Sequence, residues 1–144
     1  MALHSSLLVL VNLAAESDVV LERAKQIADG ATLTLLHVVE YVPLEPMGES
    51  VLPTLQIESE LVERAKIRLQ QIAGAHGLAH CAQHVTAGSI KAEAWRLTQE
   101  LKCDLIVIGN HERHGLRALL NFTEDAILHV APCDVLAVHL PNAG

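Results

Sequence analysis

The sequence predicts a single α/β domain, spanning residues 1–144, with a doubly wound, five-stranded parallel sheet and helices on both faces. Two observations lead to this prediction. Short continuous apolar runs alternate along the chain with longer segments whose apolar residues recur at helical spacing, and short turns join them. Hydrophobic residues make up 51% of the chain but aromatic residues only 2%, so the core must be aliphatic. Such a composition suits a parallel sheet covered by helices.

The first part of the chain is predicted to form a strand, a helix and a second strand. Leu7–Val11 (LLVLV) is a continuous apolar run, which is typical of a buried strand. Asn12 ends this run, and the polar Glu16–Asp18 stretch has the composition of a helix N-terminus. Apolar residues then follow at helical spacing as far as Gly30, which is expected to cap the helix. The second strand is Thr32–Val39.

A loop and a long helix are predicted next. Tyr41–Pro53 holds three prolines and one glycine, which indicates a loop. A long loop in an α/β domain often covers a site, although this one would also serve as a simple bridge to a distant helix. Helical spacing predicts a helix over Thr54–His76, closed by Gly74 and Gly77, and Ala79–Val85 is a weaker third strand.

The last part of the chain completes the alternation of strands and helices. Its predicted elements are the turn Thr86–Gly88, a helix capped by Ser89 that runs to about Leu101, the strand Asp104–Ile108, a helix over about Leu116–His129 and the strand Val135–Leu140. The first and fourth strands are both unbroken apolar runs, as expected of strands that are buried on two faces. We therefore predict that they are central neighbours in the sheet.

Composition also excludes several classes of protein. The net charge is -7 with histidines neutral, and three residues are aromatic, so the chain lacks the positive charge and the stacking rings of a nucleic-acid binder. No apolar run approaches the ~20 residues that span a bilayer. The start of the chain lacks the pattern of a signal peptide. Three separated cysteines predict free thiols in a reducing compartment, so we expect a cytoplasmic protein.

The stretch after the fourth predicted strand is the first candidate for a site. The apolar run stops at Gly109, and the polar turn Asn110–His114 precedes the next predicted helix. A strand, a glycine turn and a helix in this order often hold a phosphate at the glycine end. However, this turn is not rich in glycine, and Glu112 places a carboxylate in it.

Other groups of reactive residues give no catalytic or metal site. His111 and His114 flank Glu112, and the His80–His84 segment contains a cysteine, so both contain residue types that bind zinc. A solvated polar loop and an exposed edge strand explain them as well, and we expect no bound metal. His37 lies inside an apolar strand and is expected to be a hydrogen-bonded core histidine. No nucleophile elbow, Cys/His pair or paired carboxylates occur, so we expect no enzyme activity and no catalytic residue.

Five segments together give the chain a family resemblance. The chain resembles the universal stress protein family over essentially its full length. The segments that carry the resemblance are LVLVN ending at Asn12, LLHVVE at Leu35–Glu40, AGS at Ala87–Ser89, CDLIVIGNH at Cys103–His111 and APCDVLAV at Ala131–Val138.

The resemblance implies a fold, an assembly and a role. The fold is a sheet of order 3-2-1-4-5, of the adenine nucleotide alpha hydrolase-like type. The assembly is a homodimer formed partly through the last strand, whose residues are Val135, Leu136, Ala137, Val138 and His139. The role is in stress response or signalling through protein partners, which the sequence does not identify. One branch of the family also binds ATP between the first and fourth strands, at the switch point of the sheet.

The ATP-binding branch has a glycine motif that this chain does not complete. The pattern is Gly, two residues, Gly, nine residues, then Gly-Ser or Gly-Thr. Gly109 matches the first glycine, but Glu112 and Phe122 stand at the second and third, and Thr123 keeps the hydroxyl. A second alignment, anchored on the last strand, places Asn121 at the third glycine and Phe122 at the hydroxyl. Neither alignment restores the motif.

We therefore expect no bound cofactor, with ATP or AMP as the alternative ligand of a nucleotide-dependent switch that hydrolyses slowly at most. A carboxylate at position 112 would repel a triphosphate. Positive charge at His111, Arg113 and His114 favours an anion instead. Asparagine replaces the usual aspartate at position 12. The candidate nucleotide-binding residues, carried over by position, are Asn12, Val38, Gly109, His111, Arg113 and Thr123.

Overall fold

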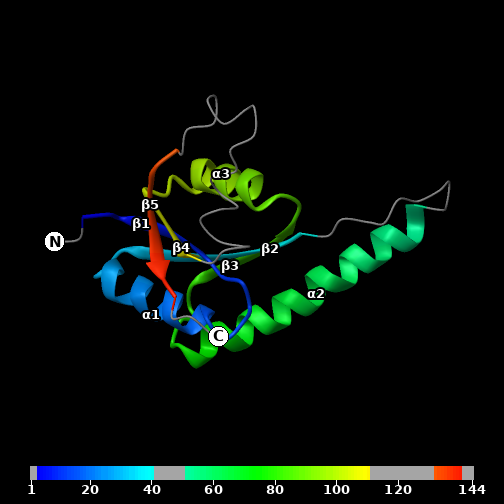
Figure 1. Ribbon diagram of the computed structural model, residues 1–144, viewed down its shortest axis with the longest axis horizontal. Helices are drawn as coiled ribbons and strands as arrows, with labels where there is room; N and C mark the ends of the chain where they lie inside the picture. The colour runs from blue at the N-terminus through cyan, green and yellow to red at the C-terminus, as the bar shows by residue number, and fades with distance from the viewer. Residues whose placement is uncertain (1–2, 41–50, 111–131, 141–144) are drawn as a thin grey trace.

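The computed structural model of the chain describes residues 3–40, 51–110 and 132–140 (Figure 1). No helix within these ranges has both the length and the apolar character needed to cross a bilayer. The elements in chain order are β1 (Ser6–Leu10), α1 (Ser17–Ala28), β2 (Thr32–Val39), α2 (Val51–Ala75), β3 (Ala82–Ala87), α3 (Ile90–Leu101), β4 (Leu105–Asn110) and β5 (Asp134–His139).

The five strands form one parallel sheet in the order β3-β2-β1-β4-β5. This order confirms the predicted topology, and β1 and β4 are neighbours as expected. Val9 at the centre of the sheet pairs with Leu35 on one side and with Val107 on the other, and all three side chains are fully buried. The continuous apolar runs thus mark the strands that are covered on both faces.

Helices cover both faces of the sheet, as predicted. Successive residues of a strand point to opposite faces, so alternate residues of β1 belong to two separate cores. Leu7 and Val9 pack with residues of α1 and α2, whereas Leu8 and Leu10 pack with residues of α3. In Figure 1, α1 and α2 accordingly lie on one side of the sheet and α3 on the other. The predicted helix Leu116–His129 lies outside the described residues.

Two predicted boundaries of helices were wrong. Asp29, with φ +44°, caps α1 one residue before the predicted cap Gly30, which itself has φ +93°. Helix α2 begins at Val51, so the end of the predicted loop is helical. Pro53 is tolerated because it lies in the first turn, where a backbone N–H has no helical partner. Gly74 lies within α2, and Gly77 follows it with φ +72°.

The third strand starts later than predicted, and this changes one candidate site. Strand β3 is Ala82–Ala87, so His80 and Cys81 lie in the turn before it and only His84 lies in the strand. His80 and His84 therefore do not lie together in the predicted strand Ala79–Val85. The pairing with β2, from Thr34 opposite Ala82 to Val39 opposite Ala87, determines where this edge strand begins and ends.

Strand β4 continues through the glycine at which it was expected to stop. Gly109 pairs with Val138 and Asn110 with His139, so these two residues belong to the strand and not to a turn. Strands β1 and β5 each lie one residue earlier than predicted. These corrections have one cause, because the partner strand and not the local sequence decides which residues pair.

Candidate functional site

A cavity of about 320 Å³ lies at the carboxyl ends of β1, β2 and β4. The chain leaves β1 toward β2 on one side, while β4 lies on the other side, so this is the topological switch point at which open α/β sheets bind ligands. The described lining residues are Leu10, Val11, Asn12, Ser17, Val20, Leu36, His37, Val38, Val39, Glu40, Ile90, Ile108, Gly109 and Leu140.

The structure brings three of the predicted site residues together. Asn12 follows β1, Val38 lies near the end of β2 and Gly109 lies near the end of β4, and all three line the cavity. The parallel arrangement explains this, since the carboxyl ends of neighbouring parallel strands meet at one edge of the sheet. The other three predicted residues, His111, Arg113 and Thr123, lie outside the described residues.

Gly109 is closely packed within the cavity wall. A Cβ atom built at this position would lie 2.9 Å from Leu140 Cδ1 and 3.2 Å from Val20 Cγ2. Both neighbours are buried residues of the core that α1 and α2 cover. The backbone of Gly109 has no positive φ, so its conformation alone would accept another residue. The close approach of Leu140 and Val20 therefore explains the glycine without any ligand.

Asn12 organises the turn between β1 and α1. Its Oδ1 atom accepts a hydrogen bond from the Ala14 N–H at 2.9 Å, and its Nδ2 group donates to Glu16 Oε1 at 2.9 Å. The intervening Leu13 has φ +65°, a left-handed conformation that side chains other than glycine rarely adopt. An aspartate at position 12 would face the Glu16 carboxylate, so the amide suits this turn better than the usual acid.

His37 is a cavity residue that sequence reasoning assigned only to the core. Its Nδ1 atom lies 2.7 Å from the carbonyl oxygen of Val11, which confirms the predicted hydrogen bond. Burial lowers the pKa of His37, although this hydrogen bond and the Glu40 carboxylate oppose the shift. The ring is therefore neutral at pH 7, and its Nδ1–H donates to the Val11 carbonyl. Its place inside an apolar strand gave no sign of a cavity beside it.

The polar groups of the cavity suit binding better than catalysis. The Ser17 hydroxyl donates its proton to the Ala14 carbonyl, so this proton is not shared with a base. Among the described lining residues, Glu40 is the one carboxylate and none is lysine or arginine. This part of the cavity therefore favours a neutral or cationic portion of a ligand. Within the described residues, no group of three or more His, Cys, Asp or Glu side chains is arranged to hold a metal ion.

Three other residues with reactive side chains have structural roles. Asp104 lies at the opposite edge of the sheet, where its carboxylate accepts hydrogen bonds from the backbone N–H groups of Ser5 and Ser6, which lower its pKa. Cys103 and Cys133 pack with the core that α3 covers. Burial raises the pKa of both thiols, that of Cys133 to about 11, so neither is a reactive thiolate at pH 7.

Comparison with known proteins identifies the family. The profile of the Universal stress protein family matches residues 5–139, nearly the whole chain. The chain belongs to this family. Universal stress protein A homolog 1 of Coxiella burnetii is 36% identical over 138 residues, which are 94% of this chain and 96% of that protein. A stress-response role follows from this membership at the level of the family.

Solved structures share the fold of this universal stress protein. Hypothetical protein MJ0577 superimposes with a TM-score of 0.69 at 20% identity, over 96% of this chain and 98% of that one. Two other structures contain nucleotides. A universal stress protein in complex with cAMP has a TM-score of 0.58 at 21% identity, over 96% of this chain and 99% of that one. A family member from Arabidopsis thaliana with AMP bound has a TM-score of 0.57 at 15% identity, over 96% and 93%.

Proposed function

We propose that this universal stress protein acts in the cytoplasm as a non-enzymatic homodimer that signals through protein partners. The evidence for the homodimer comes from strand β5. It is the last strand in the sheet order, and its residues Val135, Leu136 and Ala137 are all partly exposed. An apolar edge strand is prone to aggregation unless something pairs with it or covers it. A second copy, related by a two-fold axis, would pair with it.

If β5 forms the dimer interface, a charge added to this strand should weaken the dimer. Ala137→Lys places two lysines near the two-fold axis, where like charges oppose pairing. We expect the wild type to sediment as a dimer at micromolar concentration, and the variant to dimerise at least about tenfold more weakly, which corresponds to ~1.4 kcal/mol.

A matched variant distinguishes the loss of strand pairing at β5 from a general effect of added surface charge. Ala82 is an exposed residue of β3, the strand at the other edge of the sheet, so Ala82→Lys should leave the dimer intact. A monomeric wild type, or a dimer that Ala137→Lys leaves unchanged, would refute the proposed interface.

The cavity supports a second function, namely binding of an adenine nucleoside or of AMP. Its walls are mainly apolar, as a purine ring requires, and Asn12 and Glu40 supply polar groups for a base or a ribose. The cAMP and AMP complexes of two family members support this ligand class. ATP is expected to bind weakly, because Glu112 and Phe122 replace glycines of the motif. Loss of two or three hydrogen bonds to a charged group, at ~1.5–3 kcal/mol each, weakens binding at least about a hundredfold.

Calorimetric titration of adenosine, AMP and ATP tests this second function. We expect binding of adenosine and AMP, and little heat from ATP at sub-millimolar concentration. Ile90→Trp adds bulk at a partly exposed cavity residue and should weaken adenosine binding at least about tenfold, or ~1.4 kcal/mol. Ile67→Trp, on the exposed face of α2, should not.

Three results would contradict either the nucleoside site or its expected preference against ATP. The first is no heat from adenosine or AMP at millimolar concentration. The second is equal adenosine affinity in the two tryptophan variants. The third is micromolar ATP affinity, or ATP released by acid from the purified protein, which would show that the broken glycine motif does not exclude a triphosphate.

A further inference from the structure

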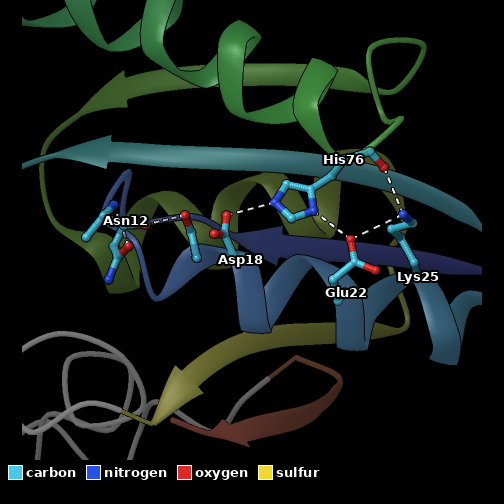
Figure 2. A network of polar contacts seen from close by, with 7 residues as sticks. Asn12, Asp18, Glu22, Lys25 and His76 are labelled. Atoms are coloured by element: carbon cyan, nitrogen blue, oxygen red, sulfur yellow. Dashed lines mark hydrogen bonds and ion pairs between the residues drawn. The ribbon is translucent and has the colours of Figure 1, made fainter. Parts of the chain in front are cut away.

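A network of ionic hydrogen bonds joins the end of α2 to α1 (Figure 2). His76, the residue after α2, points its ring at α1, where Nδ1 lies 2.6 Å from Glu22 Oε2 and Nε2 lies 2.8 Å from Asp18 Oδ1. The Lys25 ammonium donates to the His76 carbonyl oxygen at 2.9 Å and to Glu22 Oε2 at 3.3 Å. The three partners lie one helical turn apart on the same face of α1.

The geometry determines the charge of this histidine. A carboxylate accepts hydrogen bonds and does not donate them, so both ring nitrogens must carry protons for both contacts to form. His76 is thus an imidazolium whose side chain is only 12% exposed. Hydrogen bonds to Glu22 and then to Asp18 raise its pKa above the ordinary 6.5, against the effect of burial. Within the described chain, the charged groups that contact His76 are Asp18, Glu22 and Lys25, all on α1.

The backbone at Asp18 connects this network to the turn beside the ligand cavity. Asp18 directly follows Ser17, a cavity residue whose N–H and hydroxyl both donate to the Ala14 carbonyl. Ala14 in turn donates its N–H to Asn12, the second cavity residue on this turn. The turn between these residues contains Leu13 in its left-handed conformation, which persists only where the surroundings hold it. In Figure 2, a dashed line joins Asp18 to His76, and Asn12 lies near the start of α1.

We propose that His76 is a positioning residue for the ligand cavity, which holds the Asn12–Ser17 turn in place through Asp18 and releases it when the ring loses a proton. A neutral ring donates from one nitrogen only, so one carboxylate would then face a lone pair. Asp18 would lose its anchor, and the strained turn would relax and displace Asn12 and Ser17 from the cavity wall. The effect on ligand affinity rests on the proposed nucleoside site, whereas the effect on the turn does not.

The direction of the pH dependence follows from the raised pKa. A histidine whose folded-state pKa exceeds 6.5 stabilises the fold fully below that pH, and the stabilisation disappears as the pH rises through the folded-state pKa. The turn should therefore be ordered at about pH 6 and looser at about pH 9. The affinity for adenosine, which does not titrate in this interval, should fall by about fivefold over the same range.

NMR titration of the whole protein tests the coupling without a ligand. We expect the backbone amide signals of Ala14 and Ser17 to shift with the same midpoint as the His76 ring, above 6.5. The shift should be absent in His76→Gln, which keeps a donor but does not titrate. His4 offers a matched control, because it binds Asp134 at 2.9 Å with a side chain 14% exposed. His4→Gln should leave the shift unchanged.

The outcomes of these experiments distinguish the proposed role of His76 from the proposed nucleoside site. Signals of Ala14 and Ser17 that do not follow the His76 midpoint, or that still titrate in His76→Gln, would overturn the role of His76. Adenosine that fails to bind at any pH, together with a turn that follows His76, would refute the nucleoside site and leave the coupling established. An adenosine affinity independent of pH in the wild type would show that the turn does not control the cavity.

Discussion

Gly109→Ala is expected to lower the free energy of unfolding by about 1–3 kcal/mol, the usual cost of an added methyl group in a packed core. The new Cβ atom would lie 2.9 Å from Leu140 Cδ1 and 3.2 Å from Val20 Cγ2. Leu140 Cδ1 is the end of a flexible side chain beside the cavity and can shift in part, whereas Val20 is β-branched and stiff at χ1. Urea unfolding of the wild type and the variant measures the difference.

Two further variants identify the contact that causes the loss. In a Leu140→Ala background the nearest obstacle is removed, so the added methyl group should cost markedly less, as a double-mutant cycle would reveal. Gly74→Ala, within α2, meets nothing within 4 Å and should instead stabilise the protein by roughly 0.5–1 kcal/mol. If Gly109→Ala unfolds at the same urea concentration as the wild type, packing does not explain this glycine.

Ile106→Ala is expected to have the larger effect, a loss of about 2–5 kcal/mol. Ile106 is the second residue of β4, is fully buried and packs in the core beneath α3. Its removal would leave a cavity that rigid neighbouring strands cannot close. Urea unfolding with an unchanged denaturant slope would show that the loss is one of stability.

An exposed isoleucine provides the comparison. Ile67 on α2 is 58% exposed, so Ile67→Ala should change the free energy of unfolding by less than about 0.5 kcal/mol. Similar losses from the two substitutions would contradict the assignment of Ile106 to the core.

Part of the candidate site could be predicted from the sequence because it lies at strand ends. The apolar runs locate β1, β2 and β4, and parallel strands bring their carboxyl ends to one edge. Asn12, Val38 and Gly109 were carried over by position from the family resemblance, and all three line the cavity. Ser17 and His37 were missed, since a helix N-terminus and a core histidine have the same local sequence whether or not a cavity lies beside them.

The packing role of Gly109 could not be predicted from the local sequence. A glycine after an apolar strand is typical of a phosphate-binding turn, and the sequence contained nothing against that interpretation of the residue itself. In the structure it pairs with Val138 inside β4 and accommodates Leu140, a residue 31 positions further along the chain. Only the folded chain brings these residues together, so only the structure shows how closely this glycine is packed.

The sequence by itself determined the α/β class, the alternation of elements and the two-sided burial of the central strands. These properties depend on the period of apolar residues, which is local and readable in one chain. The tertiary structure decided the ends of β3 and β4, the cavity that joins three strand ends, and the contact of His76 with Asp18 and Glu22. Strand pairing and ion pairing between distant residues depend on how the helices and strands are arranged in space. The spacing of residues along the chain does not reveal that arrangement.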